Sequence, residues 1–243
     1  MALPSQHLPA AVLRPVRGHH AFEACVEQLA TAIRLGVYPR GTTLPAERDL
    51  AELLAVSRAT LREAMAALRQ AGLVETTRGR GGGTVVTLKP GTPSARAAAR
   101  ISATRRQDWL DALDFRRIVE PGAAALAASR PLDDVRRQQL EAAHVEVAAA
   151  GKPAAHRQAD SRFHLTIASL TDSARTVEAV TSVQSVLHEM LLAIPVLDTN
   201  IAHSDRQHTR LVAAILAGKP DRARRAMEEH CDDTAALLRG LVG

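Results

Sequence analysis

Aromatic side chains are scarce in this chain of 243 residues, which contains one Trp, one Tyr and three Phe. Proteins that bind single-stranded nucleic acids stack bases on such rings, so this class is disfavoured. Cysteine is almost absent too, because Cys25 and Cys231 are too few for a disulfide framework, which favours a reducing compartment. No stretch approaches the roughly 18 apolar residues of a membrane span, and residues 1–20 lack the apolar core of a secretion signal. We therefore predict a cytoplasmic protein without a membrane partner.

Charge is abundant but unevenly distributed. Residues 1–100 contain 13 Lys and Arg against 7 Asp and Glu, a net charge of +6, whereas residues 101–243 contain 18 against 19, a net charge of −1. Clustered positive charge attracts the phosphate groups of nucleic acids. We therefore expect a polyanionic partner for the N-terminal part alone.

Proline and glycine divide the chain at the same place. The run Lys-Pro-Gly-Thr-Pro-Ser at 89–94 stops any regular element, so we place one domain at 1–88, a linker at 89–107 and a second domain at 108–243. In the second domain, apolar residues recur every three or four positions between breaks. This spacing predicts a compact antiparallel bundle of helices over Asp108–Ser129, Asp133–Ala150, Ala154–Leu170, Ala174–Ile194, Asp205–Ala217 and Pro220–Leu238.

The first domain contains the pattern of a helix-turn-helix. A helix over His20–Leu35 precedes it. Residues 44–54 then predict a short helix with proline in its first turn, the next two residues a tight turn, and Ser57 the cap of a second helix that stops at Gly72. Apolar residues bury one side of this second helix, which leaves three polar side chains near its start on or beside the exposed face, namely Arg58, Thr60 and Arg62.

A hairpin with a basic tip follows. Residues 73–77 and 84–88 are rich in β-branched residues and flank the glycine-rich run Arg78–Gly83, which predicts a wing. An exposed arginine pair or a glycine run alone more often means a solvated helix face or a flexible turn. Their order within the basic part of the chain instead predicts binding to double-stranded DNA. A phosphate-binding loop is disfavoured because no Gly-Lys-Ser/Thr and no helix follow the glycines. The predicted fold is therefore mainly α, an N-terminal winged helix-turn-helix plus a C-terminal all-α bundle.

The residues of this domain match a known signature. The runs Leu-Pro-Ala-Glu-Arg-Asp-Leu-Ala at 44–51 and Val-Ser-Arg-Ala-Thr-Leu-Arg-Glu-Ala at 56–64, with Arg-Gly-Arg-Gly at 78–81, resemble the GntR superfamily of bacterial transcription regulators. The resemblance implies a homodimer that binds a pseudo-palindromic operator. It assigns DNA contacts to Arg48, Ser57, Arg58, Thr60, Arg62, Arg78, Gly79 and Arg80. Ala59 stands where relatives often have a polar residue.

The second domain contains candidate metal ligands. Asp160 and His164 are four residues apart on one predicted helix, so their side chains lie on the same face and can share a cation. His208 and His230 fall in the two C-terminal helices, and bundles commonly assemble metal sites from inward-facing side chains of different helices. Taken singly, each histidine is more often a core or surface residue. From the residues alone, both interpretations stay open.

The surrounding blocks resemble the all-helical FCD effector domain of the FadR-type branch of the same superfamily. They are Asp-Phe-Arg-Arg-Ile-Val-Glu-Pro at 114–121, Asp-Ser-Arg-Phe-His at 160–164, Gln-His at 207–208 and Ala-Met-Glu-Glu-His at 226–230. The resemblance assigns the metal to Asp160, His164, His208 and His230. Gln207 replaces an acidic residue that is frequent before the third ligand, and we expect it to alter the orientation of His208.

Three imidazoles and one carboxylate suit a divalent metal, with zinc expected ahead of nickel or manganese. The resemblance further implies that a small carboxylate effector binds at open positions of the metal. Arg116 could contact this acid through its guanidinium. Alternatively it forms an intrahelical pair with Glu120, worth about 0.3–0.5 kcal/mol on a surface. The remaining histidines of this domain are expected to be structural or solvated: His144, His156, His188 and His203.

The sequence thus predicts a ligand-responsive transcription regulator and not an enzyme. A repressor is expected ahead of an activator. A metal-dependent hydrolase is the rival class, but no HExxH string supplies a general base beside a metal. A DNA-binding protein with a purely structural metal is the second alternative. Ligand response separates the two kinds of regulator, because a structural site stabilises the fold but leaves operator affinity independent of small acids.

Overall fold

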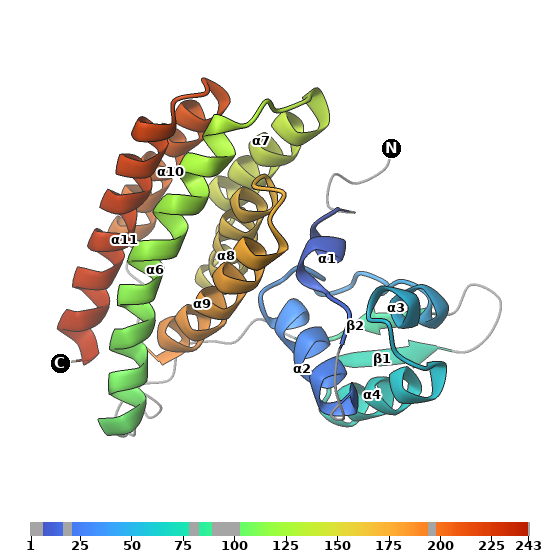
Figure 1. The fold of residues 1–243 in the computed structure, drawn as a ribbon. Helices are drawn as coiled ribbons and strands as arrows, with labels where there is room; N and C mark the ends of the chain where they lie inside the picture. Colours follow the sequence, from blue (N-terminus) through green and yellow to red (C-terminus); the bar gives the residue numbers. More distant parts are fainter. Residues whose placement is uncertain (1–6, 17–20, 78–82, 89–102, 194–197, 243) are drawn as a thin grey trace. The chain divides into compact units, whose positions relative to one another are not determined.

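The structure is a computed structural model that describes residues 7–16, 21–77, 83–88, 103–193 and 198–242. The chain divides into two compact units, Met1–Pro90 and Gly91–Gly243, and this division lies within the predicted linker (Figure 1). Among the described residues, no helix is long and apolar enough to cross a membrane. Each unit is described by itself below.

The first unit is a winged helix-turn-helix, as predicted. Its elements are α1 (His7–Val12), α2 (Ala21–Arg34), α3 (Glu47–Leu53), α4 (Arg58–Gln70), β1 (Val74–Thr77) and β2 (Gly83–Val86). Ser57 caps α4, because its Oγ accepts a hydrogen bond from the backbone N of Thr60 at 3.0 Å. The opposite face of α4 buries Leu61, Ala64, Met65 and Leu68 in the core of the unit.

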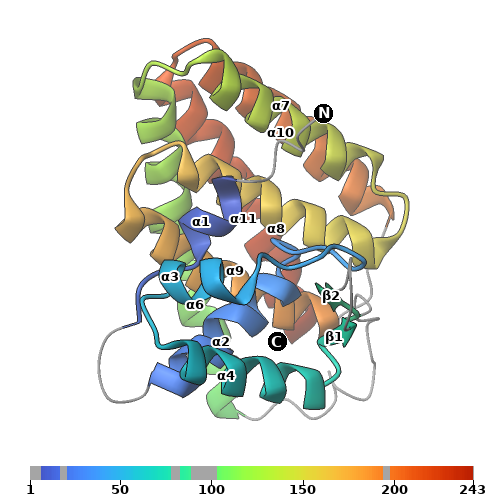
Figure 2. The ribbon, with the colours of Figure 1, turned by 90° about the vertical axis from the view of Figure 1, so that its right-hand side faces the viewer.

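The wing contains more than the two predicted strands. β1 and β2 pair antiparallel, with Val74 opposite Val86, and Figure 2 shows them side by side. Thr43 adds a bridge to Val85, and the backbone N of Leu44 donates to the carbonyl of Thr84 at 2.8 Å. Because this pairing extends the backbone there, α3 begins at Glu47 and not at the predicted residue 44.

The N-terminal residues 7–16, for which no element was predicted, belong to this unit. Val12 and Leu13 are buried. The backbone N of Arg14 donates to Gln28 Oε1 at 2.8 Å, and the backbone N of Val16 donates to the carbonyl of Leu54 at 2.7 Å. These bonds attach the segment to α2 and to the end of α3.

The second unit is an all-α bundle, as predicted. Its described helices are α6 (Ala103–Ser129), α7 (Asp134–Ala149), α8 (Pro153–Ser169), α9 (Ala174–Ala193), α10 (Asp198–Leu216) and α11 (Pro220–Val242). Two of them begin earlier than predicted, α6 by five residues within the predicted linker and α10 by seven. The extra turns contain neither proline nor glycine, so nothing in the sequence stops the helix there.

Helix α6 lies against α8, α9, α10 and α11, and Figure 1 shows it passing through the middle of the bundle. The main apolar core gathers around Phe163 of α8 and includes Leu140, Leu211 and Met227. A second cluster around Trp109 and Leu238 closes the other end. Most of α8 is buried, including polar residues such as His164 and Ser161. Buried polar groups need hydrogen-bond partners or ligands, so the polar residues buried on α8 indicate a candidate functional site in the bundle interior.

Candidate metal centre and DNA-binding surface

The predicted DNA contacts of the helix-turn-helix lie on one exposed surface. Ser57, Arg58 and Arg62 are exposed at the first turns of α4, while Thr60 is half-buried with its hydroxyl 2.8 Å from Ser57 Oγ. Ala59 is exposed in the same turn. A capped helix start that projects cations from the face opposite its buried side has the geometry required to enter a major groove.

Two carboxylates accompany these cations. Glu47 Oε2 accepts from Arg62 Nε at 3.2 Å, which joins α3 to α4, and Asp49 Oδ1 accepts from Arg48 Nε at 3.0 Å. The role of Glu47 was not predicted, because the contact spans 15 residues and has no local signal. The wing residues Arg78, Gly79 and Arg80 fall outside the described residues.

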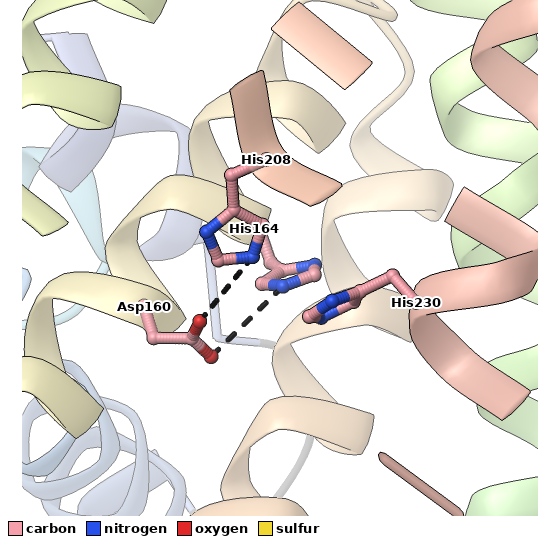
Figure 3. Close-up of side chains that lie close together, drawn as sticks. All are labelled: Asp160, His164, His208 and His230. Atoms are coloured by element: carbon pink, nitrogen blue, oxygen red, sulfur yellow. Dashed lines mark ion pairs between the residues drawn. The ribbon is translucent and has the colours of Figure 1, made fainter. Parts of the chain in front are cut away.

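The predicted metal ligands come together in the interior of the second unit. Asp160 and His164 project from α8, His208 from α10 and His230 from α11, and Figure 3 shows their side chains pointing toward one another. One ligand atom from each lies within 4.8 Å of those of the other three. The three histidines are buried and Asp160 is half-buried. Residues separated by 70 positions in the sequence therefore form one cluster of donors.

The distances in the cluster suit a single ion. Asp160 Oδ1 lies 3.5 Å from His208 Nε2, and Asp160 Oδ2 lies 3.9 Å from His164 Nε2. Ligand atoms that each lie about 2 Å from one metal are roughly 3–4 Å apart. Both ring nitrogens of His164 are buried and make no hydrogen bond among the described residues, so Nε2 is available as a ligand atom. The donor set thus fits a divalent metal.

Contacts behind two of the imidazoles orient them. Glu120 Oε2 of α6 lies 2.9 Å from His164 Nδ1, and Gln207 Oε1 lies 3.1 Å from His230 Nδ1. The contact with Gln207 is a hydrogen bond and that with Glu120 is a close approach of the two atoms, and each favours the tautomer that leaves Nε2 as the free ligand atom. Gln207 was expected to affect His208, and this was wrong: its side chain reaches across to α11, and its Nε2 donates to Asp233 at 2.7 Å. Adjacent residues on a helix point about 100° apart, so Gln207 contacts His230 and Asp233 of α11, whereas His208 Nε2 lies near Asp160 of α8.

Arg116 and Glu120 form a buried ion pair beside the cluster. Arg116 Nε donates to Glu120 Oε2 at 3.0 Å, and each side chain is 1% exposed. The two interpretations of Arg116 are therefore compatible. Its Nε serves the pair with Glu120, while its Nη1 and Nη2 are buried and have no hydrogen-bond partner among the described residues. Gln184 of α9, which no sequence signal indicated, donates to Glu120 Oε1 at 2.6 Å.

The charge states favour metal binding. Burial lowers the pKa of His208 to about 3, and burial also lowers the pKa of His230 well below its ordinary value, so both imidazoles are neutral with a free lone pair. Burial alone would raise the pKa of Glu120, but the charge of Arg116 and the contact with His164 outweigh it, so this pKa lies below its usual range. Burial opposes the charged form of Arg116, yet the carboxylate of Glu120 raises its pKa above the ordinary value.

The other histidines of the bundle stay outside the cluster. His156 Nε2 lies 3.6 Å from Asp205 Oδ1, and His144 Nε2 lies 3.2 Å from the hydroxyl of Thr209. His203 is exposed and contacts Asp233 at 2.8 Å. His188 is buried.

Comparison with known families covers both units. Residues 22–86 match the family described as bacterial regulatory proteins, gntR family, and residues 111–233 match the FCD domain. The chain belongs to the GntR family. More narrowly, this GntR regulator has the FadR-type architecture with an FCD domain, as the sequence motifs predicted. It is a DNA-binding transcription regulator and not an enzyme.

Relatives of known description agree with this assignment. The GntR regulator is 34% identical over 213 residues to a protein of Mycobacterium gastri described as the HTH-type transcriptional regulator RmpR, covering 86% of this chain and 76% of that one. It is 34% identical over 203 residues to an Escherichia coli protein described as an L-lactate dehydrogenase operon regulatory protein, covering 78% and 75%. Each is a transcription regulator by description.

Solved structures support the fold. Streptococcus agalactiae GntR is similar with a TM-score of 0.50 at 26% identity, over 89% of this chain and 99% of that chain. Escherichia coli McbR/YncC is similar with a TM-score of 0.56 at 17% identity, over 93% and 100%. At this identity, the second likeness concerns the fold alone.

Proposed function

We propose that this GntR regulator is a homodimeric repressor that acts in the cytoplasm and whose helical unit binds a divalent metal, zinc, together with a small organic acid. One observation carries the proposal: a cluster of buried metal donors lies beside a buried arginine with two unpartnered guanidinium nitrogens, Nη1 and Nη2 of Arg116. A buried cation with free donors costs free energy unless an acceptor occupies the space.

The chain's own residues divide the work. Asp160, His164, His208 and His230 hold the metal, and Glu120 joins the two parts of the site because it contacts His164 and Arg116 with the same carboxylate. When bound, the metal would supply a positive charge that attracts a carboxylate to its open positions. The free edge of the Arg116 guanidinium can then accept the acid in a bidentate contact.

A regulatory mechanism follows from the fact that the proposed metal-coordinating residues come from different helices. The donors come from three helices, so a bound metal and acid favour the arrangement of α8, α10 and α11 that contacts them best. Coupling of this kind typically changes the affinity at a second site by about 1–3 kcal/mol. The acid would thereby alter operator affinity, and the repressor assignment predicts that it lowers it.

An exposed apolar face of α6 supports the homodimer. Ile118 is 73% exposed, Phe115 43% and Leu126 38%, and their spacing places them on one side of the helix. A Cβ added at Gly122, between them, would meet no atom within 4 Å. Apolar side chains gathered on one exposed helix face indicate a protein contact, and an isologous pairing of two copies through it matches a pseudo-palindromic operator.

The test of self-association compares two substitutions to aspartate, one of an exposed isoleucine on α6 and one of an exposed valine on α7. Ile118→Asp on α6 should convert a dimer into a monomer in light scattering of the purified protein. Val135→Asp on α7 adds the same charge at a side chain that is 55% exposed and should leave the dimer intact. A dimer that survives Ile118→Asp would show that another surface joins the copies.

The test of ligand response uses the metal-loaded full chain and a duplex that the wild type selects from a random DNA pool. Elemental analysis should find about one zinc per chain. A panel of acids of two to six carbons is then screened by thermal shift and by operator affinity, and the relative described as an L-lactate dehydrogenase operon regulator recommends L-lactate for the panel. One acid should raise the melting temperature and reduce operator affinity.

Arg116→Lys provides the matched control, because it keeps a cation beside Glu120 but loses the fork that binds a carboxylate in two places. It should retain the metal and weaken the response to the acid by about tenfold or more. His208→Ala should lose both metal and response. A metal that binds in the wild type without any acid altering operator affinity would identify a purely structural metal. A full response in a metal-free wild type would contradict the proposal.

A further inference from the structure

A basic groove lies between α10 and α11, apart from the candidate metal centre. Its volume is about 370 Å³. Alanines from both helices line it together with one carboxylate, that of Glu229, and the four cations Arg210, Lys219, Arg222 and Arg225. A volume of this size lies in the range of small-molecule sites.

The spacing of the residues explains the groove. Arg222, Arg225 and Glu229 recur every three or four positions along α11, so they lie on one face of that helix. Arg210, Ala213 and Ala214 likewise recur every three or four positions on α10, which packs against α11. Small residues on the facing sides leave a trough, and the long basic side chains border it.

Among the described residues, one of the four cations of this groove is paired and three are not. Arg210 forms an ion pair with Glu229, with its Nη2 3.2 Å from Oε2, but within the part of the chain that the structure describes, the side chains of Lys219, Arg222 and Arg225 make no ion pair or hydrogen bond. Arginines at the neighbouring end of the bundle are engaged. Arg136 pairs with Asp172 at 2.8 Å, and Arg137 donates to the carbonyl of Leu216 at 3.2 Å. The groove thus concentrates free positive charge in a unit of near-neutral composition.

These three exposed cations stand at the less favourable end of a helix, although solvent weakens the effect. The N-terminal end of a helix carries partial positive charge and attracts anions, whereas cations are favoured at the C-terminal end. Lys219 immediately precedes α11, Arg222 lies in its first turn and Arg225 one turn later. Asp221 also belongs to the first turn but does not line the groove. An anion in the groove would relieve the repulsion among the three cations and the helix end.

We propose that this groove binds a small phosphate-bearing anion. Guanidinium groups match the geometry of phosphate oxygens with two parallel hydrogen bonds, and Lys219 adds a third positive group. The alanines that line the groove leave space for the organic part of a phosphate monoester. The metal donors do not line this groove, so the anion would be a second input to the regulator, separate from the organic acid.

The probes are inorganic phosphate and phenyl phosphate, titrated calorimetrically into the full chain at constant ionic strength. The variant Arg222→Ala/Arg225→Ala should bind each about tenfold more weakly or worse, because two charged hydrogen-bond donors are lost. Arg224→Ala is the matched control: it removes an exposed arginine of the same helix that does not line the groove, and binding should change less than twofold.

The charge-preserving variant Arg222→Lys/Arg225→Lys should retain part of the affinity and excludes a folding defect as the cause of the loss. Phosphate binding that persists unchanged in the double alanine variant would overturn the proposal. An equal loss of phosphate affinity in the Arg224→Ala control would mean that the loss reflects only the change in net charge. A weaker salt dependence of duplex DNA binding in the double variant, with phosphate binding unchanged, would assign the groove to the DNA backbone instead.

Discussion

Glu120 Oε2 lies 2.9 Å from His164 Nδ1, and the same oxygen accepts the Nε–H of Arg116 at 3.0 Å. One carboxylate of α6 therefore contacts a proposed metal ligand of α8 and neutralises the arginine proposed to hold the effector. Because the proposed metal and effector sites share this carboxylate, we expect a shift of Glu120 to affect both.

Replacing Glu120 by glutamine tests this relationship. The substitution leaves the guanidinium of Arg116 buried without a counter-charge, which should lower the free energy of unfolding by about 3–5 kcal/mol. The amide also holds His164 less firmly, so zinc affinity should fall by roughly 10–100-fold. Urea denaturation and chelator competition measure the two effects. Glu229→Gln removes an exposed partner of Arg210 and should alter stability by less than about 1 kcal/mol. Unchanged zinc affinity in the Glu120 variant would dismiss its positioning role.

Gln207 should matter to the metal through His230. Gln207→Met removes the acceptor that lies 3.1 Å from His230 Nδ1, and zinc affinity should fall by about tenfold or more. Arg206→Met changes the preceding exposed residue and should leave zinc affinity within about twofold, since surface contacts contribute little. Chelator competition on both purified variants separates the outcomes, and equal affinities would mean that the imidazole is held by packing alone.

The start of α4 should determine DNA affinity. Arg58→Ala and Arg62→Ala should each weaken binding to a selected duplex by about 1–3 kcal/mol if the residue reads a base. A phosphate contact would instead reduce the salt slope of affinity for specific and random DNA alike. Arg69→Ala, in the last turn of the same helix, serves as the control. Full affinity in both the Arg58 and Arg62 variants would remove α4 from the interface.

Replacing Glu47 should change DNA affinity in the opposite direction to replacing Arg58 or Arg62. Its carboxylate pairs with Arg62 on the same exposed surface and repels DNA phosphates. Glu47→Gln should therefore tighten DNA binding, while breaking this exposed pair should cost less than about 1 kcal/mol of stability. Fluorescence anisotropy over a salt series measures the first effect and thermal denaturation the second. Weaker binding would mean that Glu47 positions Arg62 for the bound state.

The turn of the helix-turn-helix stores strain at Ala55. This residue has a φ of +53°, a left-handed conformation that costs a residue with a Cβ about 1 kcal/mol or more. Ala55→Gly should raise the free energy of unfolding of the first unit by about 0.5–1 kcal/mol. Ala66→Gly, at an exposed position within α4, should lower it by about 1 kcal/mol. Thermal denaturation of both variants checks the opposite signs, and a destabilised Ala55 variant would show that the turn relaxes in solution.

Sequence periodicity determined the architecture. Ser57 as a cap, the β-branched strands of the wing and the apolar spacing of the later segments act locally, so the winged helix-turn-helix and the helical bundle were predictable. The errors concern where the helices begin. α3 starts late because Leu44 pairs with Thr84, a contact between segments 40 residues apart. Residues 103–107 and 198–204 are helical because no breaker lies there, although the spacing of apolar residues did not include them.

The sequence by itself also identified Asp160, His164, His208 and His230 as candidate ligands, because the spacing of the first two and the resemblance to the FCD domain marked them. Tertiary structure alone decided which side chains surround them. Gln207 faces His230 and not its neighbour His208, and Glu120 and Gln184 meet from α6 and α9. The free cations of the α10–α11 groove likewise become visible only when their distance from every carboxylate is known. Helical spacing determines which face a residue occupies, but packing determines what that face contacts.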